Sequence, residues 1–283
     1  MKNFLTVLLA AVLLFSASVG LSGCTSREEI MAEYTAIFAK TPETDEAYEA
    51  MLEEAKTFLA ANIGKVKEED ADYMLHLYID SAKLVVEEDA EAFSLLIENY
   101  GSYASEMMQE ILALELLEIN SPLSSFDGSK PEDGIDLGDE KDSEIGGAAG
   151  ISSFWREAMK RALALEKIVE EYKETLQSGS YEYLKTTIVW QYEYYINYML
   201  LGTAECPVFE GEEHTFSEEA KEVYTELAQE NPQTITAWAV NEFFDYLNSI
   251  RFKLDYGNDA EAAKVYYNTC SYIVGEAGKR LYE

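Results

Sequence analysis

The densest set of side chains suited to ligand binding falls in one predicted helix, residues 181–202. Its candidate pocket residues are Trp190, Tyr192, Glu193, Tyr195 and Tyr198. Aromatic walls with hydroxyl tips are common in small-molecule clefts, and Glu193 could orient a cationic or hydroxylated ligand. The helix is also apolar or aromatic nearly all round, which is typical of a buried central helix. The pattern favours the buried core helix and keeps the pocket as the alternative.

A second chemical feature is Cys24, which follows an almost wholly apolar run, residues 4–19. The run is too short for a comfortable membrane span and has the pattern of a secretory signal. The residues before the cysteine complete a four-residue motif: Leu21, Ser22, Gly23 and Cys24. The first 24 residues resemble a bacterial lipoprotein signal peptide, whose lipobox is an aliphatic residue, a small residue, Gly or Ala, then Cys.

The resemblance implies that the thiol of Cys24 receives lipid, that residues 1–23 are removed, and that the mature chain begins at Cys24. Acyl chains such as palmitate would hold it at the extracytoplasmic face of a cell membrane, or at an outer membrane if the host has one. An ordinary secretory signal with a chance cysteine, or an uncleaved anchor, is the alternative. Ser26 and Glu29 form a capping-box pattern, so we expect a helix close to the lipid.

Two polar clusters have weaker patterns. Asp72, His76 and Asp80 are spaced i, i+4, i+8, which places them on one strip of a helix, and such ligands could hold a divalent cation. The strip lies away from the apolar residues, so we interpret it as a solvated face. His214, close to Glu210, Glu212 and Glu213, has the pattern of a surface histidine. We predict no metal site and no cofactor.

Apart from Cys24, the chain has two cysteines, Cys206 and Cys270. An extracytoplasmic compartment would permit a disulfide between them. The sequence leaves the bonded and the reduced pair equally open.

The composition excludes some functions. The formal net charge is −33, which repels nucleic acid and anionic lipid headgroups. No GxSxG, P-loop, HExxH or paired-carboxylate motif is present, so the sequence supports no catalytic residue and no enzyme class.

Helical periodicity dominates the mature chain and predicts an all-α fold. We expect an N-terminal helical lobe (24–120), an acidic, glycine-rich mobile loop (121–151) and a C-terminal helical lobe (152–283). Within the C-terminal lobe, residues 216–270 weakly resemble tetratricopeptide repeats. The residues that carry this resemblance are Ala220, Tyr224, Ala228, Pro232, Trp238, Ala262 and Tyr266. Helical hairpins in a degenerate repeat and an ordinary bundle both fit this pattern.

These observations predict a lipid-anchored extracytoplasmic lipoprotein. The leading hypothesis is a noncatalytic module that holds an unidentified protein partner. The alternatives are a solute-binding accessory of a transport system, whose small-molecule ligand would occupy the tyrosine-rich helix, and an enzyme of unknown class.

Overall fold

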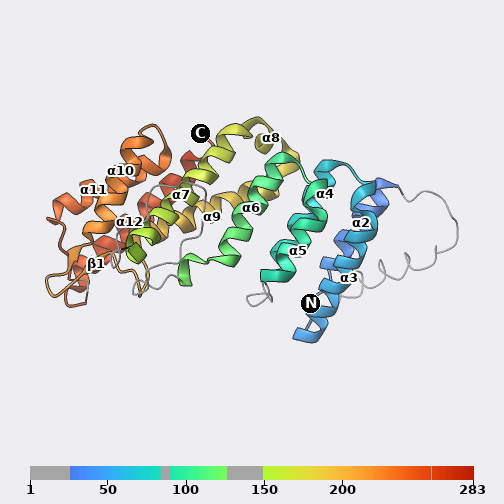
Figure 1. Cartoon of the computed structure of the whole chain (residues 1–283), viewed down its shortest axis with the longest axis horizontal. Coiled ribbons are helices and arrows are strands. Elements are labelled where there is room, and N and C mark those ends of the chain that lie inside the picture. Colours follow the sequence, from blue (N-terminus) through green and yellow to red (C-terminus); the bar gives the residue numbers. More distant parts are fainter. Residues whose placement is uncertain (1–25, 84–89, 126–148, 256) are drawn as a thin grey trace, which may run out of the picture. The chain divides into compact units, whose positions relative to one another are not determined.

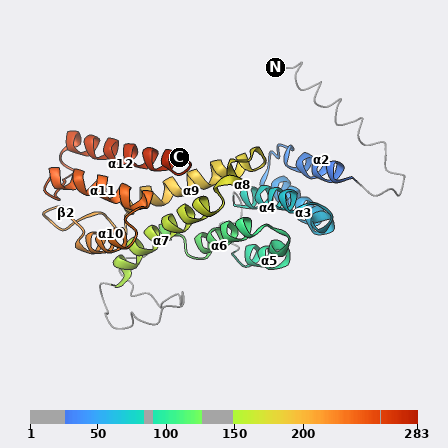
Figure 2. The ribbon, with the colours of Figure 1, turned by 90° about the horizontal axis from the view of Figure 1, so that it is seen from above.

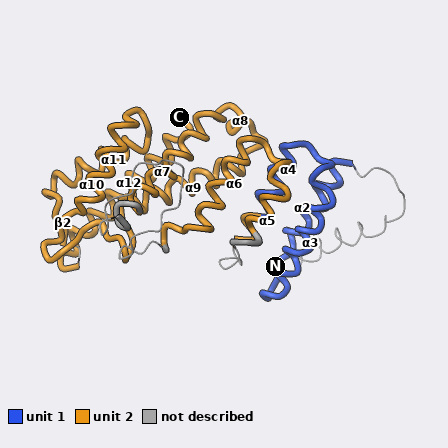
Figure 3. The backbone as a smooth tube through the Cα atoms, in the orientation of Figure 1, with its two compact units in different colours: residues 1–78 blue, residues 79–283 orange. Residues whose placement is uncertain are grey.

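The computed structural model describes residues 26–83, 90–125, 149–255 and 257–283 (Figure 1). Over these residues it contains eleven α-helices, α2–α12, and one short two-stranded sheet, which confirms the all-α fold. The lipobox with Cys24 and most of the acidic segment (126–148) lie outside the described residues. The chain divides into two compact units, one ending at Tyr78 and one spanning Ile79–Glu283 (Figure 3).

The first unit is built from α2 (Arg27–Phe38), α3 (Asp45–Asn62) and α4 (Glu68–Ala82), of which the last four residues belong to the second unit. The predicted capping box is confirmed, because the Ser26 hydroxyl accepts from the Glu29 amide and the Glu29 side chain accepts from the Ser26 amide. Helix α3 is capped by Thr44, whose hydroxyl accepts a hydrogen bond from the Ala47 amide at 3.2 Å.

Tyr34 links the helices of this unit. It is fully buried, and its ring packs on Phe38 and Phe58 with centroids 5.2 and 5.7 Å away. Its hydroxyl donates to the Met74 carbonyl oxygen at 2.9 Å, which provides the partner that a buried hydroxyl needs. The tyrosine therefore joins α2, α3 and α4.

The strip of Asp72, His76 and Asp80 on α4 is only partly solvated: Asp80 is exposed as expected, but the other two residues are buried. Asp72 is 0% exposed and His76 is 8% exposed. Helix α4 therefore buries these two polar side chains in addition to its apolar residues Ala71, Met74 and Leu75.

The second unit contains eight further helices after the end of α4. They are α5 (Ala90–Tyr100), α6 (Glu106–Asn120), α7 (Ala149–Glu171), α8 (Lys173–Gln177), α9 (Glu182–Leu201), α10 (Glu218–Glu230), α11 (Ile235–Ser249) and α12 (Ala260–Arg280). A 3-10 turn at Gly101–Tyr103 separates α5 from α6.

Helix α9 is the centre of this unit, as its apolar character predicted. It packs against α7 and α12, which lie on opposite sides of it (Figure 2). Helix α10 packs on α7 and α11, and α6 packs on α5 and α7. Helices α5 and α6 therefore belong to the same unit as α7–α12, and the chain does not divide at the acidic segment, where we expected the two lobes to separate.

Two tyrosine hydroxyls donate hydrogen bonds to backbone carbonyls in the last turn of α9. Tyr224 of α10 donates to the Met199 carbonyl at 2.6 Å, and Tyr266 of α12 donates to the Leu200 carbonyl at 2.5 Å. These carbonyls lie in the last turn, where α-helical partners are missing. Gly202 then ends the helix at φ 68°, and a Cβ there would overlap the Cys206 carbonyl oxygen. Only glycine fits this reversal without strain.

Three further features of the second unit were not settled by the sequence. A short hairpin, β1 (Phe209–Glu210) with β2 (Thr215–Phe216), interrupts the helices, although no strand pattern was visible. Helix α11 ends at Ser249. Cys206 and Cys270 are both buried, and no disulfide joins these two described residues.

Candidate functional site

The second unit contains a cleft of about 810 Å³. It is formed by side chains from α6 and α9, together with residues at the end of α4, in α5, and in or next to the 3-10 turn η3 (Leu123–Ser125). Its lining includes the apolar or aromatic residues Phe93, Ile119, Pro122, Trp190 and Tyr194 and the polar residues Asp80, Lys83, Glu115, Glu118, Gln191 and Tyr195. An apolar cleft with a few convergent polar groups is the usual form of a small-molecule site.

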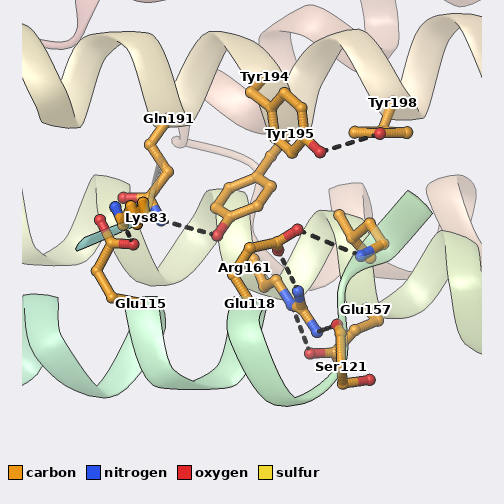
Figure 4. Close-up of polar contacts among 11 residues, drawn as sticks. Lys83, Glu115, Glu118, Ser121, Glu157, Arg161, Gln191, Tyr194, Tyr195 and Tyr198 are labelled. Carbon is orange, nitrogen blue, oxygen red and sulfur yellow. Dashed lines mark hydrogen bonds and ion pairs between the residues drawn. The ribbon is translucent and has the colours of Figure 1, made fainter. Parts of the chain in front are cut away.

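The aromatic wall of the cleft comes from one face of α9. Trp190 is 66% exposed and stacks on Tyr194, with ring centroids 5.7 Å apart and an interplanar angle of 20°. Tyr194 in turn donates a hydrogen bond to the Tyr198 hydroxyl at 2.9 Å, as Figure 4 shows. The contacts with Tyr194 and Tyr198 thus fix the aromatic wall, while the Trp190 indole remains accessible.

Lys83 and Glu115 form the first ion pair of the cleft, with the Lys83 Nζ 2.5 Å from the Glu115 Oε2 (Figure 4). The Glu115 side chain is almost completely buried. Burial raises the pKa of Glu115, and the Lys83 ammonium only partly opposes this rise. The carboxylate is therefore held where water stabilises it poorly.

The second ion pair joins Arg161 of α7 to Glu118 of α6. Arg161 is 1% exposed and pairs with the carboxylate of Glu118. It also donates to the Glu157 Oε1 and to the Ser121 carbonyl oxygen, both at 2.9 Å. Burial raises the pKa of Glu118, and Arg161 opposes that rise. Arg161 thereby fastens α7 to α6 beneath the cleft (Figure 4).

Gln191 lies between these groups and the aromatic wall. Its Nε2 donates to the Tyr195 hydroxyl at 3.0 Å. Its Oε1 is buried and has no hydrogen-bond partner among the described residues. A buried carbonyl oxygen without a donor costs about 1–3 kcal/mol. Because Gln191 lines the cleft, a molecule whose N–H group reached this oxygen would remove that cost.

The structure brings together only some of the pocket residues proposed from the sequence. Trp190 and Tyr195 line the cleft, and Tyr198 supports it through Tyr194. Tyr192 and Glu193 lie on other faces of α9. The Tyr192 hydroxyl is 3.0 Å from the Thr236 Oγ1 of α11, and the Glu193 carboxylate lies against Gly278 of α12.

The sequence analysis did not identify the polar lining residues Lys83, Glu115, Glu118 and Gln191, or Arg161, which pairs with Glu118. A signal for two of them was present. Arg161 is spaced i+3 from Ala158 and i−4 from Leu165, and Glu115 is spaced i+4 from Ile111, so both lie on apolar helix faces. A charged residue in register with an apolar stripe indicates a buried polar contact.

In comparisons with known proteins, no family model, no curated protein and no solved structure matches this chain. The residues that the structure describes contain no group of three or more His, Cys, Asp or Glu side chains placed to hold a metal ion. His214 instead faces Asp255, with its Nε2 3.5 Å from the Asp255 Oδ1. No helix in the described ranges is long and apolar enough to cross a membrane.

Taken together, the side chains of the cleft favour binding. They include one accessible indole, two ion pairs and one carbonyl oxygen without a hydrogen-bond partner among the described residues, and groups of these kinds can take part in stacking and hydrogen bonding.

Proposed function

We propose that this chain is a lipid-anchored extracytoplasmic protein that binds a small organic molecule in the cleft beside Trp190. The observation that carries the proposal is the combination of an exposed indole with a buried, unpartnered Gln191 Oε1 in one cleft. A merely structural cleft gains nothing from an exposed tryptophan, whereas a ligand gains a stacking surface there.

The lipid anchor is supported by the lipobox motif at residues 21–24. Membrane fractionation with mass spectrometry tests it, since Cys24→Ser should leave the protein unlipidated and release it from membranes. Recovery of wild-type protein with an unmodified thiol at Cys24 would contradict the anchor but not the cleft.

Thermal-shift screening against metabolites of positive, neutral and negative charge tests the binding function. A ligand at about 100 times its Kd stabilises the native state by about 2.7 kcal/mol, which raises Tm by about 5–10 °C in a protein of this size, at about 2–4 °C per kcal/mol. Trp190→Ala should abolish the shift. Tyr272→Ala is the matched control, because Tyr272 is a 60% exposed aromatic residue on α12 and does not line the cleft.

Protein binding is the second candidate function. It is favoured by the exposed large side chains of α12, Val265, Tyr267 and Tyr272, which are 48%, 48% and 60% exposed. Val265 and Tyr272 are seven residues apart and so share one helix face. Exposed aromatic residues are enriched at protein interfaces.

The same two variants separate the candidates. Affinity capture from detergent extract should lose a specific partner with Tyr272→Ala and keep it with Trp190→Ala if α12 binds protein. Loss of ligand binding with Trp190→Ala alone supports the cleft.

A further inference from the structure

We propose that the ligand of the cleft is an organic cation with N–H donors, such as a protonated primary amine. This inference rests on the proposed binding function and adds the chemical class of the ligand. Three separate features of the cleft support it: its charge, its aromatic wall and its unsatisfied acceptor.

Carboxylates outnumber ammonium groups in the lining, since Asp80, Glu115 and Glu118 face the cleft with Lys83. The Lys83 ammonium is already engaged, with oxygens of Glu115 and Asp80 at 2.5 and 3.9 Å. An anionic ligand would have to compete with these carboxylates for that ammonium group. A cationic ligand instead adds the positive charge that the lining lacks.

The second cation near the cleft is likewise committed. Each arm of the Arg161 guanidinium bonds a protein oxygen, on Glu118, Glu157 or Ser121. Arg161 is 1% exposed and does not line the cleft, so it pairs with Glu118 from the protein interior. The chain as a whole carries a net charge of −33, which attracts cations to the surface and speeds their association.

The aromatic wall suits the same ligand. The Trp190 indole is 66% exposed and is held by its stack on Tyr194. A cation within about 6 Å of an aromatic centroid is attracted by the ring quadrupole, and tryptophan attracts it most strongly.

The Gln191 Oε1 acceptor should distinguish a primary from a quaternary ammonium ligand. The Gln191 side chain is nearly buried, and its Oε1 has no partner in the part of the chain that the structure describes. A primary ammonium can donate an N–H to this oxygen, whereas a quaternary ammonium of similar shape cannot. We therefore expect the primary amine to bind more tightly than its trimethylated analogue.

Calorimetric titration of the full mature chain tests the ligand class with two probe sets. The aromatic set is phenethylamine, its trimethylammonium analogue, 2-phenylethanol and 3-phenylpropionate. The aliphatic set is 1,5-diaminopentane, 1,5-pentanediol and glutarate. In at least one set the primary amine should bind about tenfold more tightly than the neutral alcohol, a difference of about 1.4 kcal/mol.

Salt tests whether the attraction is electrostatic, and substitutions separate the cleft from general attraction to an acidic protein. Amine affinity should fall between about 0.01 M and about 1 M salt, where the Debye length shrinks from about 30 to about 3 Å. Asp80→Asn and Trp190→Ala should each weaken amine binding severalfold. The matched controls are Glu218→Gln, whose side chain is 70% exposed, and Tyr272→Ala, and neither should change it.

Each outcome bears on a different claim. If the alcohols bind as tightly as the amines and lose affinity with Trp190→Ala, the cation class is wrong and the binding function stands. If amine binding is the same in Asp80→Asn, Trp190→Ala and both controls, it is nonspecific, and the inference is overturned. If neither probe set binds and the metabolite screen gives no shift, both proposals fail.

Discussion

The Glu166 carboxylate of α7 accepts two hydrogen bonds from Thr236 at the start of α11, one from its amide at 3.0 Å and one from its hydroxyl at 2.9 Å. It also accepts from the Ile235 amide at 2.5 Å. A residue of another helix thus satisfies amide groups of the first turn, which have no partner within the helix, and places a negative charge at the positive end of the helix dipole.

Replacing this carboxylate should destabilise the second unit. We expect Glu166→Ala to lower the free energy of unfolding by about 2–4 kcal/mol, because hydrogen bonds to charged groups contribute about 1.5–3 kcal/mol each but are not additive. Urea denaturation followed by circular dichroism measures the loss. Glu170→Ala, an exposed change on the same helix, should stay within about 0.5 kcal/mol, and equal effects of the two would contradict the capping role.

Arg161 should be far more important for stability than its neighbour Arg156. Arg161→Met leaves the half-buried carboxylates of Glu118 and Glu157, whose side chains are 21% and 16% exposed, without their cation, and we expect a loss of about 3 kcal/mol. Arg156 pairs with Glu226 at 2.7 Å, but their side chains are 35% and 52% exposed, so Arg156→Met should cost at most about 1 kcal/mol. Chemical denaturation of both variants checks the contrast, and a similar loss in each would refute the structural role assigned to Arg161.

Two glycines of α12 should respond in opposite ways to alanine. A Cβ at Gly278 would overlap the Glu193 carboxylate of α9, whereas a Cβ at Gly275 meets no atom within 4 Å. Gly275→Ala should therefore stabilise by about 0.5–1 kcal/mol through helix propensity. Gly278→Ala should destabilise by about 1–3 kcal/mol, the usual cost of overpacking.

A second background tests the cause of the Gly278 effect. In Glu193→Ala protein the obstructing carboxylate is gone, so Gly278→Ala should become neutral or stabilising. Thermal melts of the four proteins of this cycle measure the coupling. An unchanged penalty in the Glu193→Ala background would show that the contact with Glu193 is not its cause.

Glu115 should make the stability of the second unit depend on pH. Burial raises its pKa in the folded state above the unfolded value, with Lys83 opposing the rise only partly. Its contribution to stability is therefore fully present below the unfolded pKa of about 4.3 and is lost as pH rises through the folded pKa. Relative to wild type, Glu115→Gln should become progressively more stable from about pH 4 towards neutrality.

Denaturation midpoints across this range measure the Glu115 effect. Glu182→Gln, whose side chain is 73% exposed, provides the control and should show the smaller change with pH. A constant difference between wild type and Glu115→Gln would contradict the argument.

Much of the helical architecture could be predicted because its signals are local. Ser26 with Glu29, the start of a helix after Ser217 and the cap at Asp259 each involve residues within four positions of one another. The predicted centrality of α9 also held, since a helix that is apolar all round must be buried to remain in water.

The candidate site was only partly predictable. The sequence identified Trp190 and Tyr195 but grouped them with Tyr192 and Glu193, which face α11 and α12 instead. Residues one or two positions apart point to different sides of a helix, so a run of tyrosines cannot say which ring faces a cleft. The buried positions of Arg161 and Asp72 depend on neighbouring helices as well.

By itself, the sequence determined that the chain is helical and where many of its helices begin, and it predicts a lipobox at residues 21–24. Only the tertiary structure decided which polar side chains are buried, that the two units separate near Tyr78, and that Lys83, Glu118 and Gln191 share one cleft. The physical reason is range: a helix cap is a contact within one turn, whereas a cleft is made by side chains distant in sequence that meet only when the helices pack.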